Sequence, residues 1–200
     1  MTKKIDRRTF IKASVAAGGA AAILPQTIFS SSVKKRIKLG FIGTGLRGQW
    51  MLWLATKYPD VDIPAICDID DKMIHDALKI VKKSGKPKPN VYKNGDEDFL
   101  NMVDNEELDG VYIATPWKWH HPMSVAAMKS GKHVGTEVPA ALTVEECWDL
   151  VKISERTGKL CMIMENVCYR RDVLAILNMV RQNMFGELLH CQGGYQHDLR

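Results

Sequence analysis

The feature that most constrains the fold is a glycine-rich turn that joins an apolar strand to a helix. Residues 37–42 form a short apolar run, and Gly43, Gly45 and Gly48 follow directly in the pattern G-x-G-x-x-G. In such a unit the first glycine permits the tight turn, the second lets the backbone approach a pyrophosphate, and the third allows close helix packing. The phosphates lie at the helix N-terminus. The pattern therefore predicts a dinucleotide-binding unit.

An acidic residue follows the next predicted strand. Residues 61–67 are mostly apolar, and Asp68 comes next, twenty residues after Gly48. A carboxylate at this position accepts hydrogen bonds from a ribose hydroxyl and repels a 2′-phosphate, which favours NAD over NADP. Asp70 is a competing candidate, although it lies in the turn.

Strands and helices alternate along the following residues. Thr143, with Glu146 three residues later, forms a capping box in front of one helix. Continuously apolar strands that alternate with helices are typical of a parallel sheet covered on both faces. The sequence therefore predicts an α/β fold, a Rossmann doubly wound parallel sheet. The predicted helices are 49–57, 70–83, 99–102, 121–129 and 144–157, the further strands are 110–114, 132–135 and 160–164, and 85–94 is a predicted loop.

The pattern changes after Asn166. Apolar residues between Val173 and Met184 recur at helical spacing, and residues 188–192 resemble a strand. A single helix and strand bury little core, so they predict the start of a second α/β domain with an open sheet. The expected organisation is a leader (1–32), an NAD-binding Rossmann domain (33–165) and the beginning of a C-terminal substrate domain (166–200).

The leader is predicted to be a twin-arginine signal peptide. Arg7 and Arg8 precede a weakly apolar stretch, residues 13–24, which is the pattern of an export signal for folded proteins. This stretch falls short of the roughly 20 strongly apolar residues that a membrane span needs. The protein is therefore expected to be periplasmic or otherwise exported by the twin-arginine route, with no membrane span.

The basic charge of the chain belongs to this leader and its junction. Residues 1–38 contain nine Lys or Arg and one acid, a net charge of +8, against +5 for the whole chain, so the remaining residues carry −3. A folded part with this charge does not favour nucleic-acid binding.

Cysteine and histidine residues give no metal pattern. His120 and His121 are adjacent, and neighbouring residues rarely face the same ion. The cysteines lack C-x-x-C and zinc spacing, and most lie in apolar runs, so we expect no metal site and buried thiols rather than disulfides. The five cysteines are Cys67, Cys147, Cys161, Cys168 and Cys191.

Together these motifs resemble the Gfo/Idh/MocA family of NAD(P)-dependent sugar oxidoreductases over about residues 37–200. The resemblance rests on the glycine motif, on the Thr-Pro…His loop that begins at Thr115, and on residues 131–134 leading to Glu137-x-Pro139. One departure matters. The usual Glu-Lys-Pro of the dehydrogenases, whose lysine assists proton transfer, is replaced by Glu137-Val138-Pro139, and an apolar side chain cannot do that work.

Within that family, five segments of the chain are similar to one branch: residues 45–49, 115–117, 136–141, 165–169 and 194–200. The branch is glycoside hydrolase family 109, the NAD-dependent α-N-acetylgalactosaminidases. The resemblance implies a sugar contact from Tyr195. Tyr169 and His197 either contact the substrate or have local roles, Tyr169 packing its ring and His197 ending a strand. The implied NAD contacts are Leu46, Arg47, Asp68, Trp117, Lys118, Trp119, His120, Glu137, Val138 and Asn166. Catalytic acid and base residues are expected beyond residue 200, so none is assigned.

The resemblance implies hydrolysis with no net use of the cofactor. Hydride passes from C3 of the sugar to NAD⁺, the C2 hydrogen is then acidic enough for elimination of the glycosidic oxygen, water adds, and the hydride returns. Because the cofactor carries the hard step, the paired carboxylates of ordinary glycosidases are unnecessary. A periplasm offers no obvious NAD pool, which suits a cofactor exported with the protein and recycled.

Two other functions stay open. A periplasmic NAD(P)-dependent sugar oxidoreductase that exchanges hydride between two bound sugars has the same fold and leader. A cofactor-binding scaffold or sugar sensor without turnover is the other hypothesis. A carbohydrate is the expected partner, and oligomerisation stays open.

Overall fold

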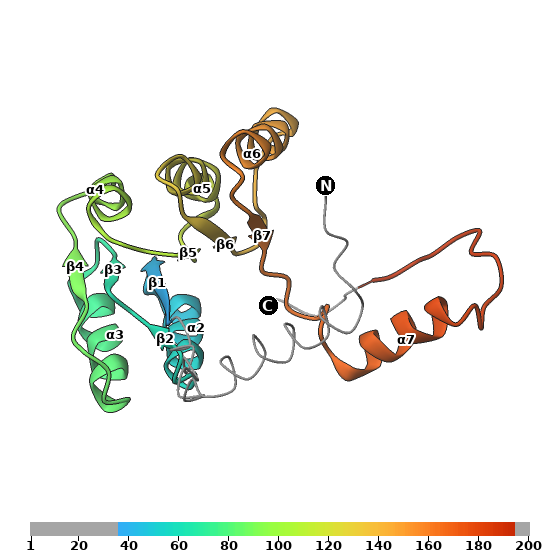
Figure 1. Cartoon of the computed structure of the whole chain (residues 1–200), viewed down its shortest axis with the longest axis horizontal. Coiled ribbons are helices and arrows are strands. Elements are labelled where there is room, and N and C mark those ends of the chain that lie inside the picture. Colours follow the sequence, from blue (N-terminus) through green and yellow to red (C-terminus); the bar gives the residue numbers. More distant parts are fainter. Residues whose placement is uncertain (1–35, 195–200) are drawn as a thin grey trace, which may run out of the picture. The chain divides into compact units, whose positions relative to one another are not determined.

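The computed structural model describes residues 36–194, which contain one parallel sheet of seven strands. The order along the sheet is β4-β3-β1-β5-β6-β7, and β2 also pairs with β1 (Figure 1). The strands are β1 (Ile37–Ile42), β2 (Val61–Asp62), β3 (Ala65–Cys67), β4 (Asn90–Tyr92), β5 (Gly110–Ile113), β6 (His133–Thr136) and β7 (Cys161–Ile163). The first strand, β1, lies at the centre, and the following strands are added first on one side of it and then on the other, so the sheet is doubly wound, as predicted.

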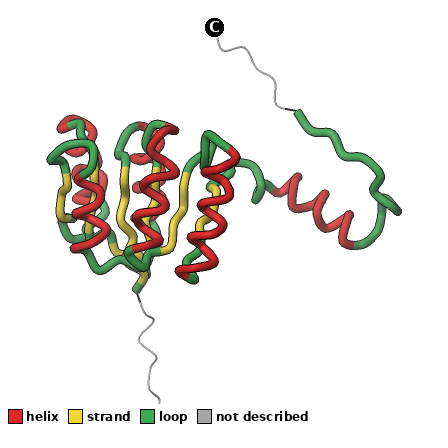
Figure 2. The backbone as a smooth tube through the Cα atoms, turned by 90° about the horizontal axis from the view of Figure 1, so that it is seen from above, coloured by secondary structure: helices red, strands yellow, loops and turns green. Residues whose placement is uncertain are grey.

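Helices cover both faces of this sheet. On one face lie α4 (Asp98–Asn105), α5 (His120–Lys129) and α6 (Val144–Thr157), and on the other lie α2 (Leu46–Thr56) and α3 (Asp71–Lys83). Figure 2 shows the helices running alongside the strands in a row. The short helix η1 (Trp117–Trp119) leads into α5, and α7 (Arg171–Arg181) follows the last strand.

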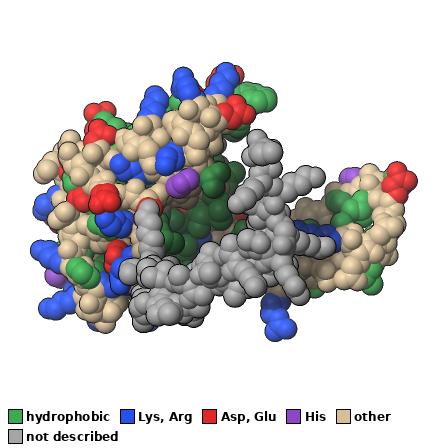
Figure 3. All heavy atoms as spheres, viewed as in Figure 1, with side chains coloured by type: hydrophobic (Ala, Val, Ile, Leu, Met, Phe, Trp, Pro, Cys, Tyr) green, Lys and Arg blue, Asp and Glu red, His purple; other side chains and the backbone are tan. Residues whose placement is uncertain are grey.

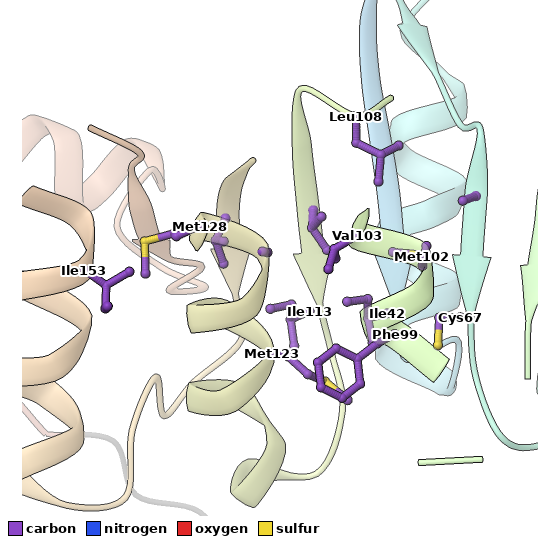
Figure 4. Close-up of a cluster of buried hydrophobic side chains, with 14 of the residues drawn as sticks. Ile42, Cys67, Phe99, Met102, Val103, Leu108, Ile113, Met123, Met128 and Ile153 are labelled. Atoms are coloured by element: carbon purple, nitrogen blue, oxygen red, sulfur yellow. The ribbon is translucent and has the colours of Figure 1, made fainter. Parts of the chain in front are cut away.

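Alternation along the strands divides the core in two. Phe41, Ile66 and Tyr112 point to the side of α2 and α3, whereas Ile42 and Ile113 pack with α4, α5 and α6. Figure 4 shows the second cluster, in which side chains from strands and helices meet around Phe99 and Met123. Both strand faces are therefore buried at the centre of the sheet, which explains its continuously apolar strands.

The face of the sheet that carries α2 and α3 is less covered toward β7. A hollow of about 300 Å³ lies there, lined by Tyr112, Gly135, Met162 and Met164 among others. Figure 3 shows hydrophobic side chains gathered in a hollow on this side of the molecule. Met162 keeps 45% of its surface exposed. The structure leaves Tyr112 at the border between a packed and an open part of the sheet.

Several boundaries differ from the sequence prediction. The run 61–67 is two strands, β2 and β3, because proline at position 64 has no N–H to continue a ladder. The predicted loop 85–94 contains β4, which is too short and too polar to stand out and forms only by pairing with β3. The helix after the glycine turn begins at Leu46, three residues before its predicted start. The predicted helix 99–102 is part of the longer helix α4.

The segment after β7 is only partly as predicted. Helix α7 forms where apolar residues recur at helical spacing, but none of its residues is buried. The predicted strand 188–192 is wrong for the described residues, because no strand lies beside it to pair with and Leu189 is 86% exposed. Tyr195 and His197 lie outside the described residues. Within residues 36–194, every helix is too short or too polar to cross a bilayer.

Candidate functional site

The carboxyl ends of β1 and β5 meet where the strand order reverses. In sheets of this kind ligands bind at that point. A cavity of about 290 Å³ opens there, close to the lower limit of roughly 300–1,000 Å³ for small-molecule sites. Its lining includes Gly43, Gly45, Asp68, Met73, Thr115 and Trp119. The glycine turn and the acidic strand end, which lie far apart in the sequence, therefore line one cavity.

Each glycine of the turn has its own structural role. Gly43 has a φ of +85°, a conformation that residues with a side chain rarely adopt. A Cβ on Gly48 would lie 2.0 Å from the carbonyl oxygen of Gly43, so only glycine lets α2 pack this closely. A Cβ on Gly45 would meet nothing within 4 Å. The space beside Gly45 is therefore open to a ligand.

This open space adjoins the N-terminus of α2. Gly45 is the N-cap residue and provides no side-chain acceptor for the first-turn N–H groups. Such N–H groups bind anions, and a pyrophosphate carries the right charge. The turn thus fits the phosphates of a dinucleotide, although the contacts of Gly43, Gly45 and Gly48 with the cofactor stay predictions.

Asp68 and Asp70, the two candidates for the ribose, have different surroundings. Asp68 accepts hydrogen bonds through Oδ2 from the backbone N (2.5 Å) and Oγ1 (3.0 Å) of Thr44, and through Oδ1 from the backbone N of Asp70 (3.0 Å). A carboxylate offers about four acceptor positions, so one remains for a ribose hydroxyl. Asp70 caps α3 instead and accepts from the backbone N of Lys72 and of Met73. Only Asp68 of these two lines the cavity.

A hydrogen-bonded network connects three of the predicted cofactor contacts. Arg47 Nε donates to Glu137 Oε1 at 2.7 Å, and Arg47 Nη2 donates to Asn166 Oδ1 at 2.6 Å. The hydroxyl of Tyr112, which the sequence reasoning did not single out, donates to the same Oε1 of Glu137. The network therefore joins α2 to the segments after β6 and β7.

Burial and charge act together in this network. Burial first, and then the hydrogen bond to Glu137, raise the pKa of Tyr112 far above its usual range. Burial opposes the charge of Arg47, but the hydrogen bond and the charge of Glu137 outweigh it and raise the pKa of the guanidinium. Tyr112 thus stays protonated and Arg47 stays charged at physiological pH.

The loop after β5 contributes an apolar wall. Trp119 lines the cavity and packs edge-on against Phe99, with ring centroids 6.0 Å apart. Trp117 is 63% exposed, and Lys118 Nζ lies 5.6 Å from the centre of the Trp119 ring. Of the two tryptophans, Trp119 thus both packs on the domain and faces the crevice.

His120 holds two loops together. Its side chain is buried, Nδ1 lies 2.6 Å from the carbonyl oxygen of Pro139, and Nε2 lies 2.8 Å from that of Thr115. Both ring nitrogens are occupied by backbone groups, so any cofactor contact of the imidazole stays a prediction. No residue pattern in the sequence indicated this bridging role.

The remaining candidate residues are exposed. Leu46 at the start of α2 is 88% exposed, Val138 is 43% exposed and precedes a cis bond to Pro139, and Tyr169 is 73% exposed. The contacts of these three side chains with cofactor or sugar stay predictions. In the described part of the chain, no group of three or more His, Cys, Asp or Glu side chains is arranged to hold a metal ion.

Family models match three parts of the chain. The model of an oxidoreductase family with an NAD-binding Rossmann fold (Gfo/Idh/MocA) matches residues 37–165. The C-terminal domain of glycosyl hydrolase 109 matches residues 169–200. The twin-arginine translocation signal matches residues 4–25 and supports export by that route.

Curated relatives and solved structures agree with these matches. A glycosyl hydrolase family 109 protein of Parabacteroides distasonis is 50% identical over 97% of this chain and 45% of its own length. An α-N-acetylgalactosaminidase of Tannerella forsythia is 48% identical over 97% of this chain and 46% of its own. A crystal structure of scyllo-inositol dehydrogenase from Lactobacillus casei, with NAD(H) and scyllo-inositol, has a TM-score of 0.66 at 23% identity over 76% of this chain and 43% of that one. The chain spans about half the length of the curated relatives it matches.

Proposed function

The chain belongs to the oxidoreductase family with an NAD-binding Rossmann fold (Gfo/Idh/MocA), and on that premise we propose that its protein is an NAD-dependent glycosidase. Its substrates would be terminal α-N-acetylgalactosaminides or related α-glycosides. The observation that carries this proposal is the 48% identity to an α-N-acetylgalactosaminidase over 97% of the chain. Val138 supports it, since a dehydrogenase of the family would usually have a lysine there.

The residues of the crevice would hold NAD. The amides at the start of α2 would bind the pyrophosphate, and the free acceptor position of Asp68 would bind a ribose hydroxyl. Bound NAD supplies a hydride acceptor that returns its hydride within the same cycle. Arg47 would hold Glu137 and Asn166 in place beside the reacting sugar, because it donates a hydrogen bond to each of them.

The segment that begins at Asn166 would contact the substrate. We propose that residues 166–200 begin a substrate domain and that Tyr195 contacts the sugar, with Tyr169 and His197 as further candidates. A base near C2 of the sugar is required, and no residue of this chain is assigned to it. The boundary of the Rossmann domain at residue 165 is part of the same proposal.

The twin-arginine signal points to the periplasm as the place of action. That route carries folded proteins, so a tightly held cofactor can be exported with the protein. A cycle with no net use of NAD then needs no periplasmic pool of the cofactor. The carbohydrate substrate would be met outside the cytoplasm.

The test is hydrolysis of an aryl α-N-acetylgalactosaminide by the full-length protein. We expect release of the aryl group without net formation of NADH, and exchange of the C2 hydrogen for deuterium when the reaction runs in D₂O. Steady NAD(P)H turnover on free sugars with no aryl release would contradict the glycosidase and support the sugar oxidoreductase. Bound NAD that no sugar reduces, again without aryl release, would point to a sensor or scaffold.

A further inference from the structure

The buried hydroxyl of Tyr112 lies behind the proposed cofactor contacts. Tyr112 is 6% exposed, and its ring packs against Phe41, with ring centroids 5.5 Å apart. A phenylalanine would satisfy this packing equally well. A buried hydroxyl needs a hydrogen-bond partner, and the one that Tyr112 has is the carboxylate of Glu137. The hydroxyl is thus explained by Glu137 and not by the core.

Glu137 in turn depends on its two donors. Its side chain is only 14% exposed, and a charged carboxylate in such a place is costly unless it is paired and hydrogen-bonded. Tyr112 donates to Oε1 from the sheet, and Arg47 donates to the same oxygen from α2. Two donors from different elements fix the position of the carboxylate. Among the described residues, Oε2 has no hydrogen-bond partner, so it can accept from a ligand.

Arg47 extends the network to the start of the next domain. Its Nε is occupied by Glu137, and its Nη2 by Asn166. A shift of Glu137 would therefore move Arg47, which lies in the first turn of the helix whose N-terminus faces the proposed pyrophosphate position.

We propose that Tyr112 is a positioning residue of the cofactor site, which holds Glu137 and through it Arg47 in the arrangement that binds NAD. This inference rests on the proposed NAD contacts of Glu137 and Arg47. Tyr112 itself touches the cofactor at no point in this scheme, and it acts through hydrogen bonds alone.

The chain offers a matched control for the loss of this hydroxyl. Tyr92 also donates its hydroxyl to a carboxylate, Glu106 Oε1, at 2.8 Å, and burial followed by that bond raises its pKa to about 12. The Tyr92–Glu106 pair does not belong to the network around Arg47. Tyr92→Phe therefore removes the same kind of bond while leaving the cofactor contacts in place.

The experiment measures NAD⁺ affinity by calorimetry and thermal unfolding for full-length protein freed of co-purified cofactor. We expect Tyr112→Phe to raise the Kd for NAD⁺ about tenfold, since a hydrogen bond to a charged group is lost. Tyr92→Phe should change the Kd by less than about twofold, while both variants lower the unfolding midpoint to a similar extent. A Tyr112→Phe variant that binds NAD⁺ like the wild type would overturn the inference.

A double-mutant cycle with Glu137→Ala tests the route of the effect. If Tyr112 acts through Glu137, Tyr112→Phe should weaken binding much less in the Glu137→Ala background than in the wild type. Equal effects in both backgrounds would contradict that route. Because NAD⁺ binding is measured without turnover, a failure of aryl release would count against the glycosidase and leave this result standing.

Discussion

Single residues decide whether the glycine turn can form and whether it leaves space for the proposed phosphates. Gly48 is required by packing, because the carbonyl of Gly43 lies where a Cβ would be. Gly45 has open space around it and an ordinary φ of −64°, so the fold does not require a glycine there. The two glycines of one motif therefore serve different needs, and substitution separates them.

Alanine substitutions at these glycines should give opposite results. Gly48→Ala should destabilise the protein by about 3 kcal/mol or more, because the backbone must move to admit the methyl group. Gly45→Ala should change stability by about 1 kcal/mol at most and weaken NAD⁺ binding at least about tenfold, since its Cβ enters the proposed phosphate space. Thermal unfolding and calorimetry measure the two effects. A stable Gly45→Ala variant with unchanged affinity would place the phosphates elsewhere.

The two aspartates after the second strand form another contrasting pair. Asp68→Ala removes two hydrogen bonds from Thr44 in the glycine turn, one from the backbone N of Asp70, and the proposed ribose acceptor. We therefore expect a loss of about 1–3 kcal/mol in stability and at least about tenfold in NAD⁺ affinity. Asp70→Ala removes only a helix cap, which should cost about 1 kcal/mol and leave NAD⁺ affinity unchanged. If Asp70→Ala were the variant with weakened binding, the assignment would be reversed.

At the scale of elements, local sequence signals predicted most helices and strands, whereas β4 is explained only by its pairing. Half of the capping box predicted at Thr143 is present: Thr143 Oγ1 accepts from the backbone N of Glu146 at 3.2 Å. The Glu146 carboxylate reaches back to the backbone N of Leu142 at 2.7 Å, one residue before the expected position. Strand β4 had no such local signal, and its residues are extended because β3 lies beside them.

Removal of the cap at α6 should affect stability alone. Thr143→Ala leaves one first-turn N–H without its acceptor, and caps of this type contribute about 1 kcal/mol. We expect a lower unfolding midpoint and unchanged NAD⁺ affinity, because α6 lies outside the crevice. Thr143→Ser retains the hydroxyl and should behave like the wild type. Loss of NAD⁺ binding in Thr143→Ala would show that α6 is coupled to the site.

At the scale of the whole molecule, the order of the strands creates the crevice. The first strand along the chain is a central one in the sheet, so β1 and β5 become neighbours although nearly seventy residues separate their glycine and Thr-Pro loops. The adjacent ends of β3, β1 and β5 bring Asp68, the glycine turn and Trp119 around one cavity. No residue of α7 is buried, and the curated relatives are about twice as long as the chain.

Export is a property of the whole chain and can be tested as such. Replacement of Arg7 and Arg8 by lysine keeps the charge but removes the paired arginines of the signal. We expect the variant to remain in the cytoplasm as a folded, NAD-binding protein, and cell fractionation measures this. A single replacement of Lys12 by arginine serves as the control and should be exported. Export of the double-lysine variant would contradict the twin-arginine route.

The sequence by itself determined the fold class, the glycine turn, the position of Asp68 at the end of a strand and the family, because these depend on local patterns and fixed spacings. It did not reveal β4, the bridge of His120 between two loops, or the hydroxyl of Tyr112 behind Glu137. Those features arise when strands distant in sequence become neighbours, so no local pattern encodes them. The predicted strand 188–192 failed for the same reason, since a strand exists only beside a partner.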